Sequence, residues 1–264
     1  MRLGLPIIGA QLAQIAMNFV DTVMAGNLSP LALAAVAVGG SLWFTVSFFI
    51  MGTMMAVTAS VAHLFGAQKK VQIGYFVRQA LWLSQGLALF SFLTVRNLDP
   101  ILFWLEIDPE IITITLGYVD AITWGLPALC AFVVLRYFSE GVSMTRPMMF
   151  IGLVGLVTNI LGNYVFMYGR FGLPAMGAVG CGWASALVMW LMLLCIIGYL
   201  TFHRYYHPFE VFERFEGPNL YAIREILKLG LPIGTSVFLE ASLFSTVALL
   251  MGSMGRDVVA GHQI

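Results

Sequence analysis

Long apolar stretches separated by short polar connections dominate the chain. A helix needs about 20 apolar residues to cross roughly 30 Å of hydrocarbon at about 1.5 Å per residue. Seven stretches meet this length, and they run approximately over residues 3–26, 32–65, 73–95, 111–137, 148–168, 176–202 and 229–252. The alternation of roughly ten residues that is typical of membrane β-strands does not occur. Because a helix satisfies its own backbone groups in lipid, the pattern predicts an all-α polytopic membrane protein.

Prolines mark the ends of these predicted helices. Most of them lie in or beside the connections. Pro6 and Pro232 fall in predicted first turns, where the missing N–H does no harm. Pro127 alone falls inside a predicted helix, and we expect it to kink the fourth helix.

One polar connection is much longer than the others and divides the chain. Residues 203–228 carry His203, His207 and several glutamates among aromatic residues. Their spacing matches no metal-ligand pattern, so we interpret the segment as an amphipathic cytoplasmic linker on the membrane surface. The predicted units are therefore a six-helix lobe at 1–202, the linker at 203–228, and the start of a second lobe at 229–264.

A short repeat supports this division. Residues 3–7 and 229–233 both read Leu-Gly-Leu-Pro-Ile. A unit with an even number of helices places its next copy on the same side of the membrane, as in parallel-repeat transporters. The sequence stops about where an eighth helix is expected, so we expect a longer protein with a further C-terminal lobe.

Composition agrees with a membrane protein. Hydrophobic residues make up 60% of the chain and charged residues 10%, against about 45–50% and about 25% in soluble domains. The formal net charge is zero, which gives no indication of a nucleic-acid partner. Cys130, Cys181 and Cys195 lie in apolar stretches at no ligand spacing, and we assign them no chemistry.

The distribution of lysine and arginine predicts the orientation. With a cytoplasmic N-terminus, the outer connections hold only Arg96, Arg170 and Arg256. The other basic residues then lie on the inner side: Arg2, Lys69, Lys70, Arg78, Arg136, Arg146, Arg204, Arg214, Arg224 and Lys228. This bias is the one that the positive-inside rule describes.

Among the acids in apolar stretches two stand out, because a charged side chain in hydrocarbon costs at least about 2.5 kcal/mol. Asp21 lies in the outer part of the first helix, and Glu240 lies near the middle of the seventh. Burial favours the neutral acid whereas a bound cation favours the carboxylate, so such a group can exchange a proton for a cation. The alternative is a carboxylate that only hydrogen-bonds neighbouring helices.

Amides on the fifth helix are candidates to join Asp21. Asn159 and Asn163 stand four residues apart on one helix face. Their oxygens would suit a hard cation, which makes Asp21, Asn159 and Asn163 candidate ligands of such a cation. Interhelical hydrogen bonding alone is the other interpretation.

Some polar and aromatic residues are candidates for a substrate cavity. The ring faces of aromatic residues favour positive charge, so part of the aromatic set would suit lipophilic cations. The candidate cavity residues are Gln14, Phe19, Trp43 and Phe44. Lipid-facing packing explains most of the remaining aromatic residues.

Several motifs together resemble the multidrug and toxic compound extrusion family, in its bacterial NorM-like branch. They are the stretches 19–26, 159–164, 168–169, 177–182 and 260–264. The resemblance implies a twelve-helix exporter in the bacterial inner membrane, built from two six-helix lobes. It also implies export of cationic lipophilic compounds, driven by sodium or proton entry and without another cofactor. Asp21, Asn159 and Asn163 then form the first-lobe cation site, and Glu240 belongs to the second lobe.

Other functions fit the sequence less well. A flippase for lipid-linked oligosaccharides would need a strongly basic cavity, whereas Asp21 and Glu240 are acidic. An intramembrane enzyme would need paired carboxylates, a metal cluster or an activated nucleophile, none of which has a suitable spacing, so we expect no enzyme. An inactive truncated product is the remaining alternative.

Overall fold

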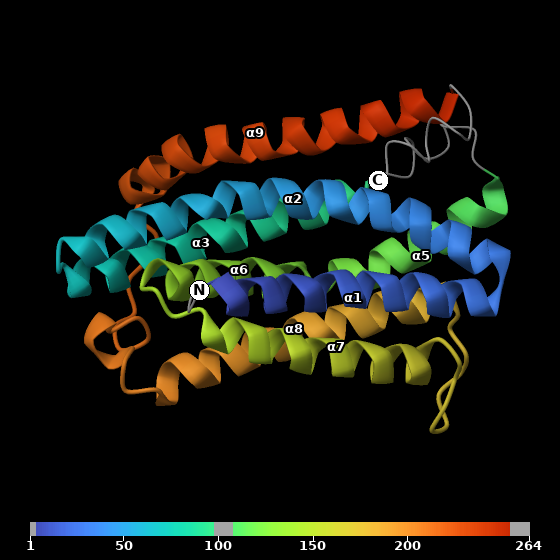
Figure 1. Ribbon diagram of the computed structural model, residues 1–264, viewed down its shortest axis with the longest axis horizontal. Coiled ribbons are helices and arrows are strands. Elements are labelled where there is room, and N and C mark those ends of the chain that lie inside the picture. Colours follow the sequence, from blue (N-terminus) through green and yellow to red (C-terminus); the bar gives the residue numbers. More distant parts are fainter. Residues whose placement is uncertain (1–3, 98–107, 254–264) are drawn as a thin grey trace.

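The computed structural model describes residues 4–97 and 108–253, with 241–253 described by their backbone alone. This part of the chain forms an elongated bundle of helices and contains no strand (Figure 1). The helices are α1 (Gly4–Leu28), α2 (Pro30–Gly66), α3 (Lys70–Val95), α5 (Pro109–Thr123), α6 (Leu126–Gly141), α7 (Arg146–Phe166), α8 (Ala178–Phe202) and α9 (Leu220–Ser253), with a short 3-10 helix η1 (His207–Phe209). The all-α membrane fold with a six-helix bundle and a seventh helix is confirmed.

Length and composition identify the membrane spans. Among the described helices, α1, α2, α7 and α8 are long and apolar enough to cross a membrane, and α5 with α6 make a fifth span if the bent pair counts as one. α3 and the described part of α9 are also long, but they carry more charge. Arg78 lies in α3, and Arg224, Glu225 and Lys228 lie in the first turns of α9.

The predicted fourth helix is two helices that meet at an angle of 49°. α5 ends at Thr123, and α6 begins at Leu126. Pro127 is the second residue of α6, where a missing N–H costs nothing. Gly125 lies in the break, and a Cβ there would stand 2.4 Å from the Met189 sulfur of α8. The bend therefore combines a proline start with close packing of α8.

The seventh helix begins earlier than predicted, which corrects two expectations. Asn219 caps it, because its Oδ1 accepts hydrogen bonds from the N–H groups of Tyr221 (2.9 Å) and Ala222 (3.3 Å). The helix therefore covers residues 220–228 of the predicted linker. Pro232 lies inside α9 and not in its first turn, so it leaves the Lys228 carbonyl without its helical donor. The lobe boundary at residue 229 stays a prediction.

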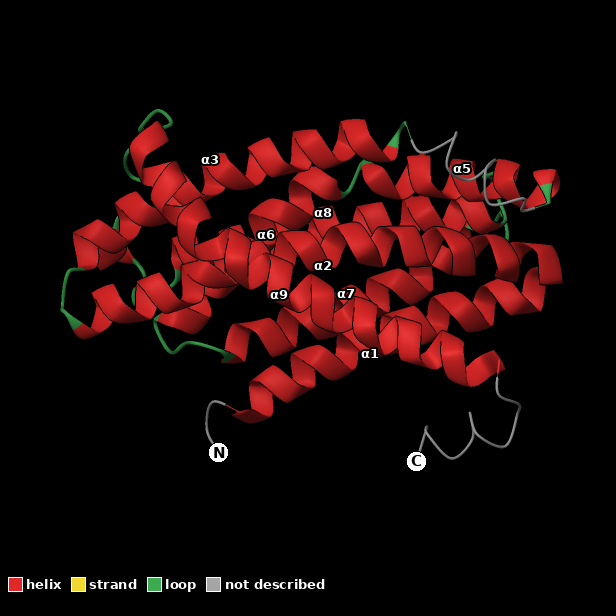
Figure 2. Cartoon of the chain, turned by 90° about the horizontal axis from the view of Figure 1, so that it is seen from above, coloured by secondary structure: helices red, strands yellow, loops and turns green. Residues whose placement is uncertain are grey.

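Close packing of small residues joins α9 to α2. Gly230 and Gly234, four residues apart, both face Thr53, and Gly52 faces the Cα of Gly234. Such small-residue pairs let helix backbones approach in membranes. The view in Figure 2 agrees, since α9 lies over α2.

The segment between α8 and α9 is tied to the ends of α3 and α6. Arg78 donates to both carboxylate oxygens of Glu216 (3.2 and 3.0 Å) and to the Glu210 carbonyl (2.5 Å). Tyr206 hydrogen-bonds Ser139 at 2.5 Å, and burial raises the pKa of Tyr206 to about 12. The segment thus docks on the bundle through buried polar contacts.

Candidate functional site

Asp21 of α1 is held by two amides of α7. Asn159 Nδ2 donates to Asp21 Oδ1 at 3.0 Å, and Asn163 Nδ2 donates to the same oxygen at 2.6 Å. Both asparagines are buried, whereas Asp21 is half-buried. The structure therefore brings together the three residues that the sequence proposed as a cation site.

Small residues allow this close approach of α1 and α7. A Cβ at Gly152 would stand 3.3 Å from the Cβ of Ala13 and 3.6 Å from the Cα of Ala10. Gly9 likewise meets the side chain of Met149. The polar groups can meet because the helices touch through nearly bare backbone.

The amide of Asn163 has an unused acceptor. Its Oδ1 is buried and has no hydrogen-bond partner among the described residues, while its Nδ2 also lies 3.4 Å from Asn159 Oδ1. In this arrangement the amide N–H groups stabilise an ionised Asp21. A half-turn of the Asn163 amide would present its oxygen in place of the NH₂ group, which is the ligand that a hard cation prefers.

Two further residues complete the surroundings of Asp21, and the sequence analysis missed both. Cys181 of α8 lies near Asp21, and Tyr118 of α5 packs in the same buried cluster as Cys181 and lines the cavity beside Asp21. The sequence feature that could have indicated close helix packing at Cys181 is the pair of glycines on either side of it, Gly180 and Gly182. A Cβ at Gly180 would meet the Phe166 backbone at 2.5 Å, and one at Gly182 would meet the Tyr118 carbonyl at 2.5 Å. These contacts bring the thiol to the site.

A cavity of about 370 Å³ opens beside this group. Its wall includes Asp21, Asn159 and Tyr118, and every helix of the first six-helix unit except α3 contributes to it. Three of the predicted cavity residues lie on it: Gln14, Trp43 and Phe44. A cavity with one acid and several aromatic rings is suited to a lipophilic cation.

Polar side chains follow one face of α1 along the cavity. Gln11, Gln14, Asn18, Asp21 and Thr22 all line it. At about 1.5 Å per residue, the face from Gln11 to Asp21 extends roughly 15 Å. This row gives a charged solute or a hydrated ion a path of hydrogen-bonding groups to the carboxylate.

Two predicted site residues lie elsewhere. Phe19 is 68% exposed and does not line the cavity, because it is turned by about 100° around the helix from Asn18. Glu240 is exposed on α9, and no described residue of α9 lines the cavity. α9 packs mainly on the outer side of α2, so the structure does not bring Glu240 to Asp21.

Known proteins provide an independent comparison. A family model described as MatE matches residues 6–165. The probable multidrug resistance protein NorM of Shewanella oneidensis is 45% identical over 100% of this chain and 57% of its own length. The multidrug resistance protein PmpM of Pseudomonas aeruginosa is 44% identical over 99% of this chain and 55% of its own length.

The fold has close structural relatives as well. One solved structure, the outward-facing conformation of a multidrug resistance MATE family transporter of the MOP superfamily, superposes with a TM-score of 0.84 at 22% identity. The superposed region covers 98% of this chain and 57% of the solved chain. The chain thus spans about half the length of the curated relatives and the solved structure that it matches.

Proposed function

Because the chain belongs to the MatE family, we propose that it acts as a cation-coupled antiporter that exports cationic lipophilic compounds. The observation that carries the proposal is the half-buried carboxylate of Asp21, held by two buried amides at the wall of a drug-sized cavity. The relatives named above are multidrug resistance proteins, which supports transport over enzymatic activity and over lipid-linked oligosaccharide flipping.

Competition for Asp21 is the proposed coupling step. In a poorly solvated site the bare carboxylate is costly, so it is occupied by a proton, a metal cation or a cationic substrate. Only one of these can neutralise the acid at a time. Binding of the coupling ion then favours release of the substrate, and binding of the substrate favours release of the ion.

Both coupling ions fit the chemistry of the group. A proton needs only the carboxylate. A sodium ion would in addition use the oxygens of Asn159 and Asn163, which are reached when the amides turn. Glu240 is proposed to act in the second lobe, apart from this group.

The protein is a multi-pass membrane protein, and we propose the bacterial inner membrane with a cytoplasmic N-terminus. The end of the bundle where α1 begins also holds Lys69, Lys70, Arg146 and Arg204, which lie at the starts or ends of α3, α7 and α8. The positive-inside rule assigns that end to the cytoplasm.

Replacing Asp21 tests the proposal. In everted vesicles that contain the protein expressed from its complete gene, Asp21→Asn should abolish cation-driven uptake of a fluorescent lipophilic cation. Asp120→Asn is the matched control, because Asp120 is 59% exposed and, within the described residues, forms an ion pair only with Arg96, at 3.4 Å on the surface. Undiminished uptake by Asp21→Asn at equal expression would exclude the carboxylate as the coupling group.

A further inference from the structure

The cavity wall carries a positive charge as well as a negative one. Arg136 of α6 lines the cavity, although it is only 14% exposed. Its Nε donates to Glu140 Oε1 at 2.8 Å, an ion pair between residues four apart on α6. This contact uses one of the five N–H donors of the guanidinium. Within the described residues its Nη atoms have no hydrogen-bond partner.

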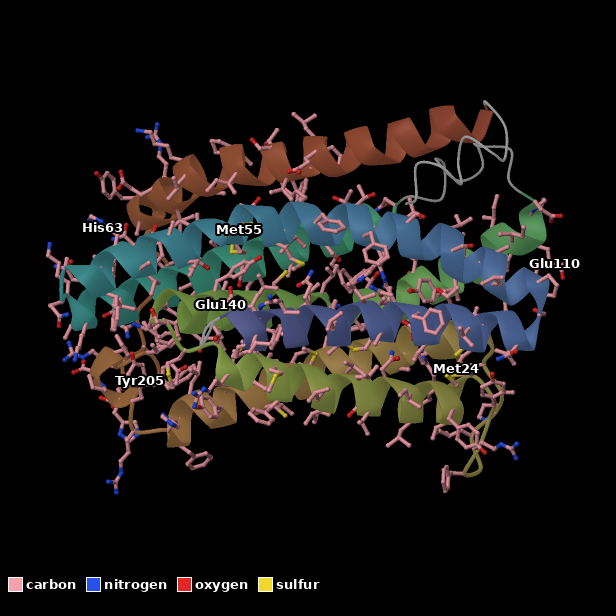
Figure 3. The ribbon with its side chains drawn as sticks, viewed as in Figure 1. Met24, Met55, His63, Glu110, Glu140 and Tyr205 are labelled. Carbon is pink, nitrogen blue, oxygen red and sulfur yellow. The ribbon has the colours of Figure 1, made fainter. Side chains whose placement is uncertain are left out.

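The two charges stand toward opposite ends of the bundle. Asp21 lies in the C-terminal third of α1, and Arg136 lies near the C-terminal end of α6. Those two helix ends point in opposite directions in Figure 1. In Figure 3, Glu140 lies toward the end where α1 begins, while Met24, one turn after Asp21, lies toward the other end. The polar face of α1 connects the two regions.

The wall also holds an unsatisfied polar group. Ser47 of α2 is 7% exposed and lines the cavity, and its hydroxyl has no hydrogen-bond partner among the described residues. A buried polar atom without a partner costs about 1–3 kcal/mol, which a ligand or a water relieves. The cavity therefore offers donors to a substrate at more than one point.

We propose that Arg136 determines specificity by binding an acidic substituent of the transported compound. The planar guanidinium presents a pair of N–H donors that matches a carboxylate, and these are the Nη atoms that Glu140 leaves unused. The cavity then takes zwitterionic compounds, with the acidic group at Arg136 and the cationic group toward the aromatic rings and Asp21. This inference rests on the proposed transport function and assigns Arg136 of the cavity wall to the acidic group of such a compound.

A pair of dyes that differ only in one charge tests the proposal. A rhodamine ethyl ester is a monocation, and the same dye with a free carboxylate is a zwitterion. Binding of each is measured by fluorescence anisotropy on the purified protein in nanodiscs. Arg136→Gln should weaken binding of the free acid roughly tenfold, which corresponds to about 1.4 kcal/mol, and should leave the ester within about twofold. Arg146→Gln, an exposed arginine outside the cavity, should change neither.

A second variant separates recognition from folding. Arg136→Lys keeps the positive charge but loses the paired donors, so it should retain part of the preference for the free acid. Equal weakening of both dyes by Arg136→Gln, or no weakening of the free acid, would overturn the role of Arg136. If the unaltered protein binds neither dye, the proposed transport function itself fails.

Discussion

The docked linker provides a prediction whose size follows from the structure. Arg78 is 8% exposed and forms a two-point ion pair with Glu216, which is 33% exposed. Breaking a fully buried pair by removing one partner costs about 3–5 kcal/mol, because the remaining charge is left uncompensated. Glu216 is partly solvated and Arg78 keeps its bond to the Glu210 carbonyl, so we expect Glu216→Gln to cost about 2 kcal/mol.

Hydrogen exchange is the suitable assay, because Glu216→Gln should lower the stability of the linker locally. The backbone N–H of Asn219 donates to Gln79 Oε1 at 2.7 Å, and Gln79 Nε2 donates to the Gly217 carbonyl at 3.1 Å. These bonds lie directly beside Glu216. A loss of about 2 kcal/mol should speed exchange of the Asn219 amide roughly 30-fold if the linker opens as a unit.

Glu213→Gln is the matched control for this experiment. Glu213 is exposed and forms no ion pair within the described residues, so its replacement should change stability by less than about 0.5 kcal/mol. Similar exchange rates for the two variants would refute the reasoning that the Arg78 pair holds the linker. So would an increase that spreads evenly over α7 and α8.

The remaining predictions concern the site and its packing. Gly182→Ala should destabilise the protein by about 1–3 kcal/mol, because the added Cβ would meet the Tyr118 carbonyl at 2.5 Å. Gly198→Ala is the control, since its Cβ would enter open space and the change should be neutral or stabilising. Thermal unfolding in detergent compares the two variants. Cys181→Ala should lower vesicle uptake several-fold, whereas Cys181→Ser leaves a hydrogen-bonding group near Asp21 and should keep most of the activity. Equal losses in both variants would remove the thiol from the site. Phe44→Ala should weaken binding of the monocationic dye several-fold, whereas Phe19→Ala should leave it unchanged, since Phe44 lines the cavity and Phe19 does not. An equal effect of the two substitutions would contradict this assignment of the cavity wall.

The helices were largely predictable, and the exceptions have physical causes. Apolar length alone located most helix ends to within a few residues of the observed ones. The predicted start of the seventh helix was wrong because the first turns of α9 are charged and give no apolar signal. Asn219 caps these turns, so the helix begins before the apolar stretch does. Pro232 was misplaced for the same reason. Pro127 correctly predicted a bend in the fourth helix, but the full break at Trp124–Gly125 also depends on close contact with α8, which no local pattern reports.

The candidate residues on single helices could be predicted from residue type and spacing alone. The spacing of Asn159 and Asn163 places them on one face whatever surrounds them, and the cost of an acid in hydrocarbon singles out Asp21. Which helices meet at these residues follows from tertiary packing. It brought Cys181 and Tyr118 to Asp21, left Phe19 and Glu240 outside, and placed Arg136 on the cavity wall. Such neighbours depend on how closely helix backbones pack, and that closeness arises from contacts between residues far apart in the chain.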